Sequence, residues 1–131
     1  YELTQVVPGL EVAGIDISDY AVQHAKPEVQ KFLKVGSATK LPWPDKHFDY
    51  VVSLGCLHNL YAYDLHAALK ELQRVRRGSA YVMIESYRNE REKANLLYWQ
   101  LTCECFFTPA EWEWVFAKCG YTGDYGCIFF E

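Results

Sequence analysis

The chain has 131 residues, half of them hydrophobic and 16% aromatic, which is enough apolar material for one folded domain and excludes a disordered chain. Its formal net charge is −4 and its 13 basic residues are dispersed, so nucleic acid is not an expected partner. No apolar run approaches the roughly 20 residues of a membrane helix, so no membrane association is expected.

The five cysteines are an odd number in a domain that is large enough to fold without disulfides. We therefore expect free thiols and a cytoplasmic protein. Cys103 and Cys105 form a C-x-C pair, but no second pair and no histidine at ligand spacing accompanies them. No metal site is predicted.

Three strands are expected in the first half of the chain, over residues 10–16, 32–35 and 48–54. The last of these has the strongest signal, because it is β-branched, aromatic and nearly continuous. A helix over residues 1–7 is expected to end at Pro8-Gly9. A second helix is expected to begin after Ser18 or Asp19 and to end before Pro27.

In the second half, apolar residues recur at helical spacing over residues 66–75, and Arg76-Arg77-Gly78 is the expected end of that helix. A buried strand is expected over residues 79–86. Thr108-Pro109 has the composition of a helix start, with threonine as the cap and proline in the first turn. Residues 121–131 are expected to form a short hairpin.

Strands that alternate with helices predict an α/β fold, a doubly wound, Rossmann-like and mostly parallel sheet with both faces covered. In such sheets, ligands bind beyond the carboxyl ends of the strands. The residues that follow each strand are therefore the candidates for chemistry, namely residues 16–18, 36–38, 55–59 and 85–88.

Asp16 stands at the carboxyl end of the first predicted strand. A carboxylate in this place can accept two hydrogen bonds from the vicinal diol of a ribose. The alternative is that Asp16 only caps the next helix. Gly36-Ser37-Ala38 has little side-chain bulk, so its backbone could approach the edge of an adenine ring, or it is an ordinary turn between a strand and a loop.

The segment "GSATKLPWPDKHFDYVV" resembles the pattern G-D-A-x-x-L-P-F-P-D-x-S-F-D-x-V of the class I S-adenosylmethionine-dependent methyltransferases, in the small-molecule branch that includes enzymes of quinone biosynthesis. "VAGIDIS" is similar to the second motif of that family, and "LKELQRVRRGSAYVMIE" to its segment L-x-E-x-x-R-V-L-x-P-G-G and the strand after it. The resemblance covers residues 11–120. The order of the motifs is more specific than any one of them.

The resemblance implies a role for each matching residue. Asp16 would bind the ribose of S-adenosylmethionine, and Ile17 would pack on the adenine. Ser37 and Ala38 would lie at the edge of the adenine; the family commonly has aspartate at the position of Ser37. The remaining cofactor-side residues would be Leu54 and Gly55, and His58 would be the catalytic residue, beside the methyl acceptor.

Nucleotide-binding α/β folds carry a glycine-rich loop after their first strand, roughly 20 residues before the acidic residue. Counting back from Asp16 leads to a position before Tyr1. Residues 1–131 are therefore expected to form a single, N-terminally incomplete methyltransferase domain that is inactive alone. The expected activity is methyl transfer to an unidentified small molecule, and the sequence gives no oligomeric state.

Two other functions remain open. Asp16 would serve NAD equally well in an oxidoreductase, although a dehydrogenase has no use for the Leu41–Asp45 loop. A non-catalytic, methyltransferase-like binding subunit is the other alternative. If the acceptor must lose a proton, Glu85, Tyr61 and Tyr63 are further candidate bases besides His58.

Overall fold

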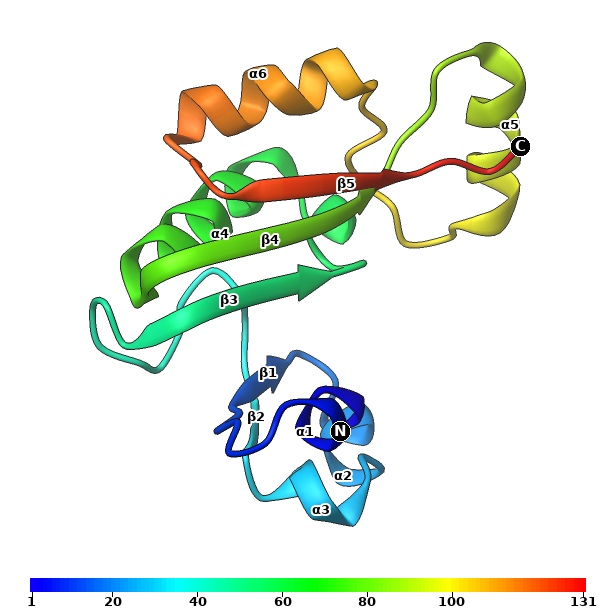
Figure 1. Ribbon diagram of the computed structural model, residues 1–131. Helices are drawn as coiled ribbons and strands as arrows, with labels where there is room; N and C mark the ends of the chain where they lie inside the picture. The colour runs from blue at the N-terminus through cyan, green and yellow to red at the C-terminus, as the bar shows by residue number, and fades with distance from the viewer.

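The computed structural model describes residues 1–131 and contains two parallel sheets (Figure 1). The smaller sheet pairs β1 (Gly14–Asp16) with β2 (Leu33–Val35). The larger sheet has the order β3-β4-β5, with β3 at Phe48–Leu54, β4 at Arg76–Glu85 and β5 at Asp124–Ile128. All paired strands are parallel, so the predicted α/β fold with parallel sheets is confirmed.

The four predicted helices are present in the expected order, and α3 and α5 are found in addition. Their bounds are α1 Glu2–Val6, α2 Asp19–Gln23, α3 Pro27–Gln30, α4 Ala62–Val75, α5 Glu90–Trp99 and α6 Pro109–Cys119, with a short 3-10 helix η1 at Leu57–Asn59. The side chain of Ser18, and not that of Asp19, caps α2. Thr108 and Glu111 form a reciprocal capping box at the start of α6, which ends at Gly120 in the left-handed conformation.

The hydrophobic core lies between the larger sheet and the helices α4 and α6, which cover one face of that sheet (Figure 1). Alternate residues of β4 point into this core, because successive side chains of a strand face opposite sides. The core is completed by Trp112 and Phe116 of α6, which stack on one another. We expected helices on both faces, but on the opposite face Tyr50, Val52 and Leu54 are exposed.

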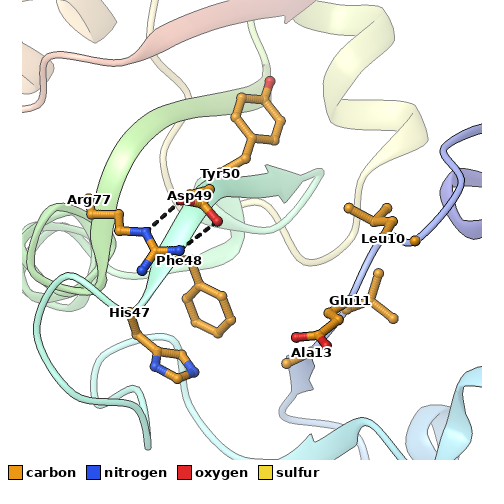
Figure 2. A pocket seen from close by; sticks show the side chains of 10 residues that line it. Leu10, Glu11, Ala13, His47, Phe48, Asp49, Tyr50 and Arg77 are labelled. Carbon is orange, nitrogen blue, oxygen red and sulfur yellow. Dashed lines mark hydrogen bonds and ion pairs between the residues drawn. The ribbon is translucent and has the colours of Figure 1, made fainter.

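The two sheets do not pair with each other, because β1 is hydrogen-bonded only to β2 and β3 only to β4. We call the space between β1 and β3 the central slot. Pockets lie along this slot. One of about 510 Å³ lies at the amino ends of the two strands, and one of about 250 Å³ lies at their carboxyl ends. Figure 2 shows the amino end of the slot, with Leu10 and Glu11 on one side and Phe48, Asp49 and Arg77 on the other.

Backbone groups on both sides of the central slot are unpaired. The Gly55 N–H donates to the Met83 carbonyl at 3.0 Å, so the odd-numbered residues of β3 turn their backbone groups toward β4. In a parallel ladder the intervening residues face the other way, so those of Tyr50, Val52 and Leu54 point into the slot. The slot thus has the open edges that a further parallel strand would need.

Three predicted boundaries were wrong. Helix α4 ends at Val75, and Arg76-Arg77-Gly78 already belongs to β4, where Arg76 pairs with Phe48. The expected hairpin is the single strand β5, since β4 is paired with it through five residues. The first strand begins at Gly14 rather than at residue 10.

Candidate functional site

The carboxyl ends of β1, β2 and β3 converge on the pocket of about 250 Å³, which we call the edge pocket. Five of the residues singled out from the sequence line it: Asp16, Ile17, Ser37, Ala38 and Leu54. Gly55 and His58 are not part of its wall. The structure therefore brings together most of the predicted cofactor-binding residues and leaves out the predicted catalytic one.

Asp16 ends β1 on the exposed rim of the edge pocket. Its Oδ1 atom accepts a hydrogen bond from the Ser18 N–H at 2.8 Å, while the Ser18 hydroxyl accepts from the Ala21 N–H at 3.1 Å and caps α2. Asp16 is thus not the helix cap, and its carboxylate keeps lone pairs for an external donor. The neighbouring side chain of Ile17 is 77% exposed, which places an apolar surface next to this carboxylate.

Ser37 and Ala38 follow β2 on the second side of the edge pocket. The Gly36 N–H donates to the Asp16 carbonyl at 2.9 Å, which ties this turn to the end of β1. A Cβ atom at Gly36 would lie 2.7 Å from Cδ1 of Ile15, so a larger residue here would require the Ile15 side chain to shift. The Ser37 hydroxyl bonds the Thr39 hydroxyl at 2.8 Å and accepts from the Thr39 N–H at 3.2 Å, so it is engaged within its own turn.

The third side of the edge pocket comes from the end of β3 and the turn after it. Leu54 is 58% exposed, and Gly55 adopts a φ of 64°, in the left-handed region that favours glycine. The Asn59 side chain donates to the Gly55 carbonyl at 3.1 Å and holds this turn. Cys56 also lines the pocket with its side chain still exposed, and the surrounding protein atoms raise the pKa of its thiol by partial desolvation, with a smaller contribution from the charge of Asp16.

The sequence analysis did not identify the contacts that hold the loop over residues 41–45, which contributes Leu41 to the wall of the edge pocket. Leu41 lines the pocket, and the Arg74 guanidinium of α4 donates to the carbonyls of Leu41 at 3.0 Å and Trp43 at 2.8 Å. Arg74 also contacts both carboxylate oxygens of Glu71, which in turn accepts from the Leu41 N–H at 2.7 Å. The guanidinium lowers the pKa of Glu71. Leu41 and Arg74 belong to two of the quoted motifs, which is the one signal that could have linked them.

His58, in η1, has no exposed surface. Its Nδ1 atom accepts a hydrogen bond from the Glu85 N–H at 3.2 Å, and its Nε2 atom lies 3.4 Å from Glu85 Oε2. Burial lowers the pKa of His58, and the charge of Glu85 opposes this effect only in part. Because His58 is enclosed in this way, its side chain does not contact a methyl acceptor directly in this conformation.

Several aromatic and apolar side chains are exposed in the segments that follow η1 and at the end of α5. Tyr61 and Tyr63 stack on each other with ring centroids 5.7 Å apart. At the end of α5, Tyr98 is 90% exposed, and Leu101, just beyond it, is 95% exposed. Exposed apolar groups of this kind can contact a further ligand or partner.

The five cysteines are free. His, Cys, Asp and Glu side chains form no group of three or more that could hold a metal ion. None of the helices combines the length and the apolar character needed to span a bilayer.

Comparison with protein families gives one match, to the family described as "Methyltransferase domain", over residues 2–84. Among solved structures, a methyltransferase dependent on S-adenosylmethionine from Archaeoglobus fulgidus aligns with a TM-score of 0.68 and 23% identity, over 91% of this chain and 54% of that one. A structure of the Haloferax volcanii Trm112 methyltransferase activator in complex with a methyltransferase gives a TM-score of 0.73 at 23% identity, again over 91% and 54%.

A protein from Pyrococcus horikoshii is 32% identical, with a TM-score of 0.50, over 55% of this chain and 37% of that one. This chain thus spans between about a third and about half of the length of these solved relatives. A search among curated proteins found no match.

Proposed function

Because this chain belongs to the methyltransferase domain family, we propose that it forms the nucleoside-binding part of an enzyme that transfers a methyl group from S-adenosylmethionine. One observation carries the proposal. Asp16, Ile17, Ser37, Ala38 and Leu54, which come from the ends of three strands, line one pocket at the carboxyl edge of the sheets. This is the edge at which α/β folds bind nucleotides.

The residues of the edge pocket fit the nucleoside end of the cofactor. The Asp16 carboxylate has free lone pairs for the two ribose hydroxyls, and the exposed Ile17 side chain offers an apolar face to the adenine. Ser37 and Ala38 lie at the opposite side, where small side chains leave room for the edge of the base. A volume of about 250 Å³ is below the usual range for a complete ligand of this size, so the pocket would hold the nucleoside alone.

The methionine end of the cofactor needs further polypeptide, and the central slot offers a place for it. We propose that an extended strand fills the slot, parallel to β1 and β3, and that its carboxyl end carries the glycine-rich turn. The proposed occupant directly precedes α1, because strand, α1 and β1 would then form one right-handed βαβ unit. Residues 1–131 would accordingly be part of a larger methyltransferase domain.

When bound, S-adenosylmethionine supplies an electrophilic methyl group on a sulfonium, which is transferred by in-line displacement. The contribution of this chain is to bind and orient the nucleoside through Asp16 and Ile17 and to exclude water through the apolar wall that includes Leu41 and Leu54. Gly55 shapes the turn beside that wall. No residue of the chain needs to form a covalent bond.

A small molecule is the proposed methyl acceptor. The exposed and stacked Tyr61 and Tyr63, which directly follow Leu60 of the pocket wall, would suit a planar or apolar compound. The dispersed charge of the chain gives no support for nucleic acid. Five free thiols favour a reducing compartment such as the cytoplasm.

Calorimetric titration of the full-length polypeptide with S-adenosylmethionine, S-adenosylhomocysteine and NAD tests the proposal. We expect both sulfur-containing nucleosides to bind and NAD to give no heat. Asp16→Asn keeps the acceptor for the Ser18 N–H but removes the charge, and should weaken binding about 10- to 100-fold, which is the value of one or two charge-assisted hydrogen bonds.

Asp19→Asn is the matched control, because Asp19 is exposed in the first turn of α2 and contacts only Gln23. Equal affinity of wild type and Asp16→Asn would contradict the assignment of Asp16. Binding of the cofactor without methyl transfer to any acceptor class would instead support a non-catalytic binding subunit.

A further inference from the structure

A buried polar pair lies outside the edge pocket and is not used in the proposed function. The imidazole of His58 and the carboxylate of Glu85 face one another across 3.4 Å, from Nε2 to Oε2, and their side chains are 0% and 7% exposed. Buried ionisable groups are expensive unless they are paired. The burial of this pair therefore indicates a structural role, which follows from the segments that His58 and Glu85 connect.

The contacts of His58 define which of its nitrogen atoms carries the proton. Nδ1 accepts from the Glu85 N–H at 3.2 Å, so it has no proton of its own, and the proton of the neutral ring is on Nε2. That N–H lies 3.4 Å from Glu85 Oε2 and makes no hydrogen bond with it, while the other Glu85 oxygen accepts from the Gln100 side chain at 3.0 Å. A second proton on His58 would place two N–H donors against each other at Nδ1.

The main chain of the same helical turn is fastened to residues 100–105. The His58 carbonyl accepts from the N–H groups of Glu104 at 2.9 Å and Cys105 at 3.0 Å. The Thr102 hydroxyl donates to the Asn59 side chain at 3.1 Å. The turn that carries His58 is thus held by β4 through its side chain, and it holds residues 100–105 through its backbone.

These contacts matter because η1 connects the wall of the edge pocket to residues 100–105. Leu57, the first residue of η1, and Leu60, which directly follows it, line the edge pocket, whereas Leu101 is almost fully exposed. A shift of η1 would therefore move the pocket wall and residues 100–105 together. His58 lies between them and contacts neither the pocket nor the solvent.

We propose that His58 is a positioning residue, which as a neutral imidazole fastens η1 to Glu85 and so holds residues 100–105 against the turn whose Leu57 lines the edge pocket, near which the methyl acceptor would lie. Only the role of the acceptor rests on the proposed function. The charged group that faces His58 is Glu85 of β4. The nearby Cys103 thiol remains neutral, because burial and the charge of Glu85 raise its pKa to about 11.

Two substitutions separate the hydrogen bond at Nδ1 from the contact at Nε2. His58→Asn keeps an acceptor near the place of Nδ1 and loses the N–H beside Glu85, whereas His58→Gln keeps an N–H near the place of Nε2 and loses the acceptor. Amide hydrogen exchange of the full-length protein should become faster at Glu104 and Cys105 in His58→Gln by about tenfold, the factor that one lost buried hydrogen bond supplies, and by a smaller factor in His58→Asn. His66→Asn, at an exposed position of α4, should have no effect.

The pH dependence of amide exchange distinguishes a His58 side chain that acts through its hydrogen bond from one that only fills space. In wild type, protection at Glu104 and Cys105 should fall as acidification protonates His58, relative to the amides of Val51 and Ser53 in β3. His58→Asn should remove this dependence, because the asparagine side chain does not titrate. The same dependence in that variant, or unchanged exchange in both variants, would overturn the proposal.

Nitrogen chemical shifts of the wild-type imidazole give a test that requires no variant. We expect a neutral ring with its proton on Nε2 at pH 7, and the opposite tautomer or a charged ring would contradict the proposed contacts. Titration with S-adenosylhomocysteine separates this proposal from the function. If the protein fails to bind that compound, the function is wrong, whereas the exchange results still decide the role of His58.

Discussion

Gly78 shows how one residue without a side chain permits the pairing of two strands. A Cβ atom at this position of β4 would overlap the main-chain carbonyl of Asp49 in β3, at the irregular part of the ladder between these strands. Nearby, the Arg77 guanidinium donates to Asp49 Oδ2 at 2.8 Å and lowers the pKa of that carboxyl (Figure 2). The close approach of β3 and β4 at this end thus depends on glycine.

We expect Gly78→Ala to lower the free energy of unfolding by about 3 kcal/mol, the upper end for overpacking, because the Asp49 backbone has to move. Gly9→Ala is the control: Gly9 has a φ of 75° and open space around it, so the cost is limited to about 1 kcal/mol of backbone strain. Urea unfolding of both variants checks the order, and equal losses would contradict it.

The burial of His58 predicts a dependence of stability on pH. Burial lowers its pKa below the ordinary value of 6.5, so the unfolded chain binds a proton more readily than the native one. Neutral His58 makes its full contribution to the free energy of unfolding at pH values above 6.5. This contribution is lost as the pH falls from 6.5 toward the pKa of His58 in the native protein. The total loss is about 1.4 kcal/mol for each pH unit that separates the two pKa values.

Chemical unfolding of wild type and His58→Asn at a series of pH values between neutral and mildly acidic measures this effect. The difference in stability between the two proteins should become smaller as the pH falls. A constant difference would show that His58 does not titrate between the folded and unfolded states.

Among the elements, those with strong local signals were predicted well. The α6 helix has its capping box and its left-handed glycine within its own sequence, and β3 is a continuous apolar and β-branched run. The end of α4 was not predictable in this way, because Arg76 is drawn into β4 by its pairing with Phe48, which is distant in the sequence. Residues 121–131 form one strand for the same reason, since β4 offers its edge to β5.

In the candidate site, too, features with a local sequence signal could be predicted, and features that depend on contacts between distant residues could not. Asp16, Ser37 and Leu54 could be placed at one edge because each lies at or just after the end of a strand, and the carboxyl ends of parallel strands meet there. The contact between Arg74 and the carbonyl of Leu41 joins positions 33 residues apart and has no local signal. Nor does the sequence reveal that His58 is enclosed, because its burial comes from β4 and from residues 100–105.

Arg74 joins α4 to the loop beneath the edge pocket, and its planar fork makes several hydrogen bonds at once. Arg74→Lys keeps the charge but offers donors from a single atom, so it cannot reach the carbonyls of Leu41 and Trp43 together with Glu71. We expect a loss of about 1–2 kcal/mol in stability and weaker binding of S-adenosylhomocysteine, measured by thermal unfolding with and without the compound. Arg91→Lys, on the exposed face of α5, should change neither quantity.

At the scale of the whole molecule, the central slot makes a prediction for the full-length polypeptide. If a strand fills it, the amides of Val52 and Leu54, which point into the slot, should exchange as slowly as those of Val51 and Ser53, which face β4. Hydrogen exchange followed by NMR measures all four. Rapid exchange at Val52 and Leu54 alone would mean that the slot stays open in the complete protein.

The family match also decides between two of the alternatives for the molecule. A match to methyltransferase domains over residues 2–84 removes the reason to prefer an NAD-dependent oxidoreductase. It does not distinguish an active enzyme from a binding subunit, for which methyl transfer by the full-length protein is the test.

The separation of the two sheets has a thermodynamic consequence. The hydrophobic core draws all of its members from residues 57–121, and no ladder connects β1 and β2 to the larger sheet. Residues 1–131 alone should therefore melt in two steps, with the N-terminal third first and a calorimetric enthalpy larger than the van't Hoff value. A strand in the slot would couple the halves into one cooperative unit, so a single sharp heat-capacity peak would itself report on the missing ladder.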